Sequence, residues 1–224
     1  MRSNPTAYWL SFVQRLLKAV RVVAVMLSAT TAYHLYVFRI TNKHFEGLNL
    51  GCGGSRIRNY CNIDASPSTL CDIVAPVDRI KVSSESVGAI YSSHLLEHIH
   101  RARAKGVLSE WYRVLKPGGK LYLCVPDEEV LFRIYLDNLP HYDTEQGKYL
   151  VDRACYLTYG GQANRYDFHF YGYSFATLRD LLQSVGFRNV QRFDRSHLDI
   201  SLPQDISVAQ VDSFPMSLNV EASK

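Results

Sequence analysis

Short apolar runs that end in glycine or a polar residue recur between positions 47 and 125, and a segment of helical periodicity interrupts them. Four of these runs predict strands of a buried sheet: Leu48–Leu50, Tyr60–Ile63, Cys71–Val74 and Val87–Ser92. A fifth run, Leu121–Val125, is apolar throughout, which is typical of a strand buried on both faces. Strands that alternate with helices predict an α/β domain with an open parallel sheet.

Two segments carry the apolar spacing of amphipathic helices. One helical face consists of Val107, Leu108, Trp111, Val114 and Leu115. Residues 117–119, Pro-Gly-Gly, end that helix. The other face consists of Phe175, Leu178, Leu181, Leu182 and Val185. Ser174 is the candidate N-cap of this second helix and Gly186 its stop. Residues 216–223 then predict a closing antiparallel strand.

The first 46 residues have a different pattern, which predicts an N-terminal helical segment. The residues that fall on one helical face are Trp9, Phe12, Val13, Leu16, Leu17 and Val20. Residues 22–38 contain no Lys, Arg, Asp or Glu and lie at the lower limit of a membrane span, but their Ser, Thr and His side chains make them a poor one. Three interpretations remain open: a helical cap on the main domain, a basic amphipathic helix on a membrane surface, and an anchor or signal sequence.

Composition narrows the class of protein. Of the 224 residues, 47% are hydrophobic and 21% charged, so the chain can bury a substantial core. The net charge of +4 comes without a dense Lys/Arg cluster, so we expect no nucleic-acid partner. The five cysteines form no C-x-x-C pair, which argues against a disulfide framework and indicates a reducing, cytoplasmic compartment.

The segment LNLGCGG at residues 48–54 places glycines directly after a predicted strand. Glycine lets a ligand approach the backbone closely because it has no Cβ. The next predicted strand ends at Asp64, where a doubly wound fold holds ribose hydroxyls with a carboxylate. Asp64 follows Gly51 by 13 positions, whereas about 20 are usual in the dinucleotide fingerprint. A full first helix has little room there, and NAD binding is not expected.

The chain resembles the class I S-adenosylmethionine-dependent methyltransferases, and in particular small bacterial methyltransferases that share three motifs with it. These are LNLGCG with NID (residues 48–64), IYSSHLLEH (residues 90–98) and EWYRVLKPGGKLYLCVPD (residues 110–127). The resemblance covers residues 47–224. It implies a Rossmann-like, doubly wound, mostly parallel seven-stranded sheet with an antiparallel last strand. The Gly51–Asp64 spacing predicts that the first helix is shortened. The resemblance also implies S-adenosylmethionine as the methyl donor.

The resemblance assigns a set of donor-binding residues. They are Asn49, Gly51, Cys52, Gly53, Asp64, Asp78, Ser93 and His94. The glycine segment would lie against the amino-acid part of the donor, and the serine and histidine would close over it. Asp64 would accept hydrogen bonds from both ribose hydroxyls, and Asp78 would face the adenine amino group. Two positions depart from the family: Asn49 replaces a more usual acid, and Gly88 replaces an aspartate and is interpreted as structural.

Residues 94–98, HLLEH, match the H-x-x-E-H pattern of zinc proteases. The position of this segment at a strand end, the lack of a persuasive third ligand and the three methyltransferase motifs lead us to expect no metal. His94 is then interpreted as facing the donor, while Glu97 and His98 begin a helix. Cys52 invites a nucleophile interpretation, but small residues are common beside such glycines, and we expect no covalent catalysis.

The stretch at residues 128–172 is long for a connection and predicts a cap insertion that carries acceptor specificity. His169 is the candidate general base because it precedes the helix that usually flanks the acceptor pocket. A ring bonded within the cap is the alternative, with equal weight. Asp127 is a second candidate catalytic residue, which would orient the acceptor or pair with a histidine.

The resemblance therefore implies methylation of a hydroxyl on a small molecule or glycan, by direct in-line transfer with a side-chain base. A phenolic or polyketide acceptor would suit the aromatic cap equally well. Two alternatives remain open: a non-catalytic module that binds S-adenosylmethionine, and a membrane-peripheral methyltransferase that acts on a lipid-linked acceptor. A homodimer and membrane-surface contact through the N-terminal helix are further open alternatives.

Overall fold

The computed structural model describes residues 45–66, 71–198, 207, 210–211 and 214–224. The chain divides into two compact units, residues 1–43 and 44–224. The first unit lies outside the described residues, and so do the predictions made for its helix and its membrane contact. No helix in the described part of the chain is long and apolar enough to cross a bilayer.

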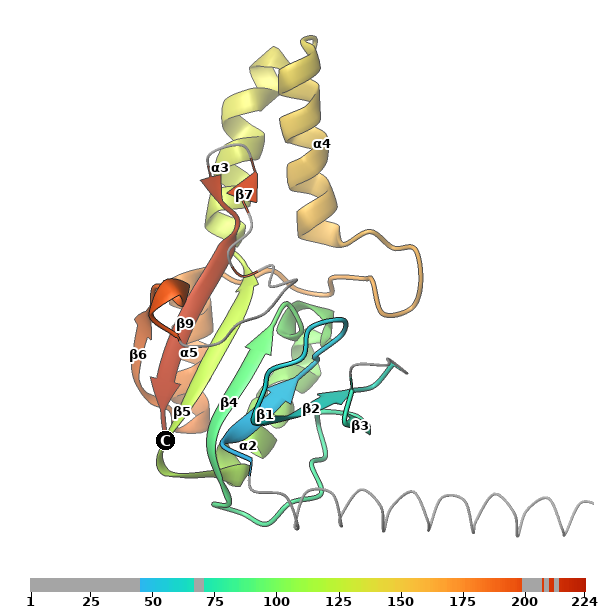
Figure 1. Cartoon of the computed structure of the whole chain (residues 1–224). Coiled ribbons are helices and arrows are strands. Elements are labelled where there is room, and N and C mark those ends of the chain that lie inside the picture. Colours follow the sequence, from blue (N-terminus) through green and yellow to red (C-terminus); the bar gives the residue numbers. More distant parts are fainter. Residues whose placement is uncertain (1–44, 67–70, 199–206, 208–209, 212–213) are drawn as a thin grey trace, which may run out of the picture. The chain divides into compact units, whose positions relative to one another are not determined.

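Seven strands of the second unit form one sheet in the order β3-β2-β1-β4-β5-β9-β6 (Figure 1). The strands are β1 (Gly47–Leu50), β2 (Tyr60–Asp64), β3 (Ile73–Val74), β4 (Val87–Ser93), β5 (Leu115–Pro126), β6 (Arg188–Arg192) and β9 (Ser217–Ser223). The first five strands pair in parallel, and β9 runs antiparallel to both β5 and β6. This confirms the predicted doubly wound, mostly parallel sheet with an antiparallel last strand.

The remaining elements are helices, short 3₁₀ turns and a small hairpin. The helices are α2 (Arg101–Val114), α3 (Glu128–Asn138), α4 (Glu145–Tyr159) and α5 (Phe175–Val185). The 3₁₀ turns are η1 (Leu96–His98), η2 (Leu139–His141) and η3 (Arg195–His197), and the hairpin pairs β7 (Gln210–Val211) with β8 (Phe214–Pro215). Ser174 caps α5 in a reciprocal capping box with Thr177, and Gly186 ends it in the left-handed conformation, as the sequence predicts.

The connection between β1 and β2 lacks the short helix that was expected in it. Within the described residues 51–59 there is no helix at all, where a shortened one was predicted. The physical reason is that the amides of Gly51 and Cys52 both donate to the Ile63 carbonyl, at 2.8 and 3.2 Å. The chain therefore folds back onto β2 directly after β1, and the loop stays against the ends of these two strands.

The predicted cap insertion, residues 128–172, contains two helices. Figure 1 shows α3 and α4 as a hairpin beyond the carboxyl end of β5. The hairpin has its own apolar cluster, which consists of Leu131, Ile134, Leu150, Ala154, Leu157, Val211 and Met216. Its helices therefore pack on each other and on the segment that leads into β9, and the chain returns from α4 toward the sheet through residues 160–173.

Candidate functional site

The sheet order identifies one edge of the molecule as the place for a ligand. Strand β1 lies between β2 and β4, so the chain leaves β1 toward one side of the sheet and leaves β4 toward the other. In open α/β sheets, ligands bind outside the carboxyl ends of the strands at this switch point. The glycine loop that follows β1 and the residues that follow β4 meet here, because Gly51 lies directly against the Leu95 side chain.

Asp64 stands at the carboxyl end of β2 and faces the glycine loop. Its Oδ2 accepts a 2.8 Å hydrogen bond from the Gly53 amide, and its Oδ1 accepts one of 2.7 Å from the Ser66 amide. The side chain is half-buried. An ionised carboxylate has about four lone-pair sites, so Asp64 can fix the loop and still accept hydrogen bonds from a ligand.

Asn49, in β1, holds the same loop in place through hydrogen bonds. It is 3% exposed. Its Nδ2 donates to the Ser55 carbonyl and to Asn62 Oδ1, both at 2.9 Å. The amide hydrogens of Asn49 thus bond to the loop and to β2, and its contact with the donor stays a prediction that only the Oδ1 atom could fulfil.

Cys52 is buried, and its Sγ lies 3.2 Å from Cys71 Sγ. Burial raises the pKa of the Cys52 thiol, and the hydrogen bond with Cys71 raises it further. A protonated thiol is a poor nucleophile, which supports the expectation that Cys52 does no covalent catalysis.

Asp78 is half-buried, and its carboxylate pairs with the Arg103 guanidinium from α2.

Ser93 ends β4, and His94 follows it in the left-handed conformation with φ 50°. The His94 side chain is 6% exposed. Its Nε2 lies 2.8 Å from Ser217 Oγ, and its Nδ1 lies 3.3 Å from Glu97 Oε1. Both ring nitrogens thus face protein atoms, so His94 positions Glu97 in this structure, and closure over the donor stays a prediction.

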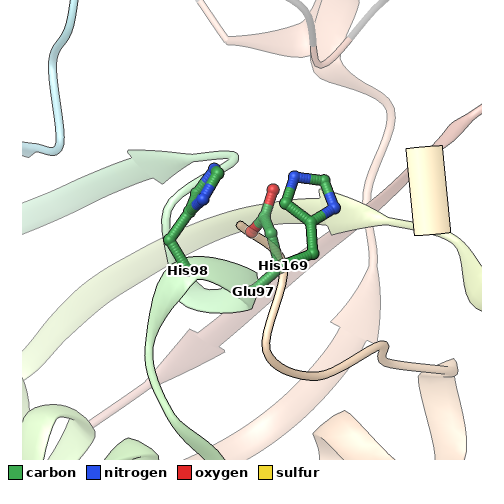
Figure 2. Close-up of side chains that lie close together, drawn as sticks. All are labelled: Glu97, His98 and His169. Carbon is green, nitrogen blue, oxygen red and sulfur yellow. The ribbon is translucent and has the colours of Figure 1, made fainter. Parts of the chain in front are cut away.

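Glu97, His98 and His169 lie together beyond the carboxyl end of β4 (Figure 2). Glu97 and His98 come from η1, and His169 comes from the segment between α4 and α5. The two imidazole rings meet edge to face, with centroids 4.6 Å apart. The backbone amide of Phe170 donates to the Glu97 carbonyl at 2.7 Å, which fastens the incoming segment to η1.

Both histidines of this cluster are held in one tautomer. His98 Nδ1 lies 3.0 Å from the Phe168 carbonyl oxygen, and His169 Nδ1 lies 2.8 Å from that of Leu157. A carbonyl oxygen only accepts, so Nδ1 carries the proton in each ring, and Nε2 of the neutral ring keeps the lone pair.

The electrostatics of the cluster favour an ionised acid beside a neutral base. Burial lowers the pKa of His169, although the charge of Glu97 opposes this. Burial alone would raise the pKa of Glu97, but the contact with His94 and the nearby His98 and His169 rings lower it below its usual value. Glu97 is 1% exposed, and its Oε1 lies 3.3 Å from His94 Nδ1. Within the described part of the chain, neither of its carboxylate oxygens accepts a well-formed hydrogen bond.

Comparison with protein families decides the class of the domain. Residues 48–123, which run from β1 into β5 and include the glycine loop, Asp64 and η1, match the family model described as a methyltransferase domain. By this match, the part of the chain from β1 into β5 is a methyltransferase domain. The recognition that the three motifs suggested is thereby confirmed at the level of the family.

Solved structures include similar folds, whereas no curated protein sequence matches the chain. A methyltransferase from Archaeoglobus fulgidus is 14% identical with a TM-score of 0.46, and the alignment covers 86% of this chain and 93% of that one. The 1,6-didemethyltoxoflavin-N1-methyltransferase of Burkholderia thailandensis is 13% identical with a TM-score of 0.47, over 100% and 92% of the two chains. A methyltransferase from Mesorhizobium loti is 18% identical with a TM-score of 0.46, over 81% and 91%.

Asp127 has a structural position in the methyltransferase domain. It is 3% exposed. Its Oδ1 caps α3 by accepting from the Glu129 amide at 3.2 Å, and its Oδ2 accepts from Arg192 at 2.9 Å. The suggested pairing of Asp127 with a histidine is therefore replaced by an ion pair with Arg192. Orientation of the acceptor by Asp127 stays a prediction.

Sequence reasoning missed the role of Glu97 and His98 as partners of His169. The H-x-x-E-H pattern was the available signal, and it was set aside because a third residue was not evident. Glu97 and His98 lie in a 3₁₀ turn, and the residue that completes the group lies more than seventy positions later, in the segment between α4 and α5. Only the folded chain brings the three together.

The glycine loop of the methyltransferase domain provides a matched pair of test positions. Gly51 and Gly53 both have positive φ, of 69° and 48°. A Cβ on Gly51 would lie 2.8 Å from Leu95 Cδ2, whereas a Cβ on Gly53 meets nothing within 4 Å. Gly51→Ala should therefore lower the free energy of unfolding by about 2–4 kcal/mol, and Gly53→Ala by only about 1 kcal/mol.

Urea unfolding measures both free energies, and titration with S-adenosylmethionine measures donor affinity. Gly53→Ala should weaken donor binding despite its small effect on stability, because the added methyl group projects into the space assigned to the donor. Equal stability losses in the two variants would show that Leu95 relaxes away from residue 51. Full donor affinity in Gly53→Ala would show that the donor does not bind against this side of the loop.

Proposed function

We propose that the chain methylates a hydroxyl group of a small molecule or glycan, with S-adenosylmethionine as the methyl donor. The observation that carries this proposal is the position of His169. A hydroxyl must lose its proton as it accepts a methyl group, and a fixed neutral imidazole is suited to take it. The Nδ1–H of His169 is bonded to the Leu157 carbonyl, so the Nε2 lone pair remains for that proton.

The residues at the switch point fit the donor. Gly53 is exposed and leaves open space on its Cβ side, so a ligand can approach the loop backbone closely. Asp64 is fixed by two amides and keeps lone pairs for ribose hydroxyls. When bound, S-adenosylmethionine supplies a methyl group on a sulfonium that an acceptor oxygen can attack in line, which leaves S-adenosylhomocysteine.

The chain's own contribution is to orient the acceptor, exclude water and move the proton. The segment that carries His169 also presents Phe168 and Phe170, which are exposed and stack with ring centroids 6.4 Å apart. Exposed aromatic rings beside the candidate base can pack on a sugar or a phenolic ring. This arrangement supports a cyclic hydroxylated acceptor.

One observation favours an acceptor with an apolar portion, as in the lipid-linked alternative. A pocket of about 330 Å³ lies between α3 and α4. It is lined by Leu131, Phe132, Tyr135, Leu136, Ala154, Cys155, Thr158 and Tyr159. Tyr159 also accepts a backbone hydrogen bond from the His169 amide, so this apolar pocket borders the anchoring point of the candidate base.

Calorimetric titration of the full chain with S-adenosylmethionine and S-adenosylhomocysteine tests the proposal first. We expect micromolar binding of both, followed by formation of S-adenosylhomocysteine when hydroxylated sugars, phenols or lipid-linked sugars are added. Donor binding without product across the whole screen would favour the non-catalytic module. If neither compound binds, the proposed function is wrong.

A further inference from the structure

We propose that Glu97, His98 and His169 bind a divalent transition-metal cation, for which Zn²⁺ is the best match. Each of the three offers one ligand atom, and these atoms lie within 4.8 Å of one another. Two imidazoles with one carboxylate are a ligand set that Zn²⁺ uses in catalytic sites. The expectation of no metal rested on the lack of a third ligand, and His169 provides one.

The first argument is the incompletely satisfied carboxylate of Glu97. This side chain is 1% exposed, and among the residues that the structure describes neither carboxylate oxygen has a well-formed hydrogen-bond partner. A buried carboxylate without partners is unfavourable by several kcal/mol. His94 Nδ1 lies 3.3 Å from Oε1, which is longer than an ordinary charge-assisted hydrogen bond, so it pairs with this carboxylate only weakly. A bound cation would supply the missing partner, which makes the orphaned carboxylate an independent sign of a ligand.

The second argument is the way the two rings are oriented. Metal-binding histidines usually donate their other N–H to a carbonyl or carboxylate, which fixes the tautomer and directs the remaining lone pair. His98 and His169 each have such a bond, to the Phe168 and Leu157 carbonyls at 3.0 and 2.8 Å. Both Nε2 atoms thus carry a lone pair and no proton, which is the state in which a histidine nitrogen binds a metal ion.

The third argument is geometric. Bonds of about 2.1 Å to a tetrahedral Zn²⁺ place the ligand atoms about 3.4 Å apart. The group spans up to 4.8 Å, so closure on the ion requires a side-chain shift of about 1 Å. Three protein ligands leave at least one coordination position for water or substrate. Among the described residues, the site therefore has the composition of a catalytic centre, without the fourth protein ligand of a closed structural centre.

The role of the cation rests on the proposed function, whereas its binding does not. A hydroxyl that coordinates to the open position would have a lowered pKa, as water does on Zn²⁺. Its O–H bond would break with the electron pair kept on oxygen, and the proton would pass to solvent. The cation would occupy the lone pair of His169, so in the metal-bound protein His169 is a ligand and the cation replaces it in activating the acceptor.

The test uses the full chain, freed of metal by a chelator and then titrated with Zn²⁺ in a calorimeter. We expect one Zn²⁺ per chain, and visible absorption bands of a low-coordinate site when Co²⁺ is used as the probe. Removal of outer-shell partners weakens metal affinity about 10- to 100-fold, so Glu97→Gln and His169→Ala should weaken it at least as much. His141→Ala removes an exposed histidine outside the cluster and should leave the affinity unchanged.

Unchanged Zn²⁺ affinity in both Glu97→Gln and His169→Ala, with circular dichroism showing folded protein, would overturn the proposal, as would a wild type that binds no Zn²⁺. If His169→Ala does not fold, His169→Gln serves in its place. Titration of the metal-free chain with S-adenosylmethionine separates this proposal from the proposed function. Loss of metal binding alone leaves the methyltransferase proposal intact, and loss of donor binding alone leaves the metal site intact.

Discussion

Asp64→Ala is expected to weaken the binding of S-adenosylmethionine about 100-fold or more. Hydrogen bonds to a charged group contribute about 1.5–3 kcal/mol each, and each 1.4 kcal/mol corresponds to tenfold in affinity. The substitution removes the carboxylate assigned to the ribose hydroxyls. It also removes the acceptor of the Gly53 amide, at 2.8 Å, and so releases the loop. Calorimetric titration of wild type and variant measures the change.

Two further variants separate these effects. Asp64→Asn keeps an oxygen for the Gly53 amide and removes the charge, so we expect an intermediate loss of about tenfold. Asp180→Ala removes an exposed aspartate on α5 and should leave donor affinity unchanged. Wild-type affinity in Asp64→Ala would show that the carboxylate does not contact the donor.

Trp111→Ala is expected to lower the free energy of unfolding by about 3–5 kcal/mol, which is a large part of the stability of an ordinary domain. Trp111 is fully buried on α2. Its Nε1 also donates to the Val77 carbonyl at 2.9 Å, which fixes the chain next to Asp78. Denaturant unfolding followed by circular dichroism measures the loss.

Trp111→Phe is the matched control, because it keeps most of the aromatic volume and removes the hydrogen bond. We expect a smaller loss of about 1–3 kcal/mol, since the Val77 carbonyl is left without its donor. If the two variants lost equal stability, the hydrogen bond and not the packed indole would hold α2 to this loop.

The parts of the fold that the sequence predicts are those set by local patterns. The apolar runs of β1 and β4 and the capped helix α5 belong to this class, because the residues that define each element are neighbours in the chain. Strand β5 shows the limit of this reasoning. It begins at Leu115 and continues through the Pro-Gly-Gly that was expected to lie outside it. The Gly118 amide and the Gly119 carbonyl are hydrogen-bonded to the backbone of Lys224, which directly follows β9. These glycines can therefore continue β5, because a residue far along the chain supplies their hydrogen-bond partners.

The residues of the candidate site likewise fall into two groups: those that the sequence predicts and those that only the fold brings together. The glycine loop and Asp64 are close in sequence and form one unit, which is why motif and spacing identify them. The cluster of Glu97, His98 and His169 depends on the backbone bond from Phe170 to Glu97. The Asp127–Arg192 ion pair likewise joins residues 65 positions apart. Neither arrangement can be recognised from the sequence, because side chains that meet through tertiary folding need not be separated by any regular number of residues.

The position of β9 affects how the sheet assembles. This strand inserts between β5 and β6, both of which precede it in the chain. A nascent chain that has not yet reached Ser217 therefore contains two strands whose facing edges have no partner, and its sheet can be completed only when the last strand enters between them. Unpaired edges promote association with other chains. Folding intermediates of this protein would be most prone to aggregation at that stage, and the rate of pairing over such long sequence separations would limit how quickly it reaches the native state.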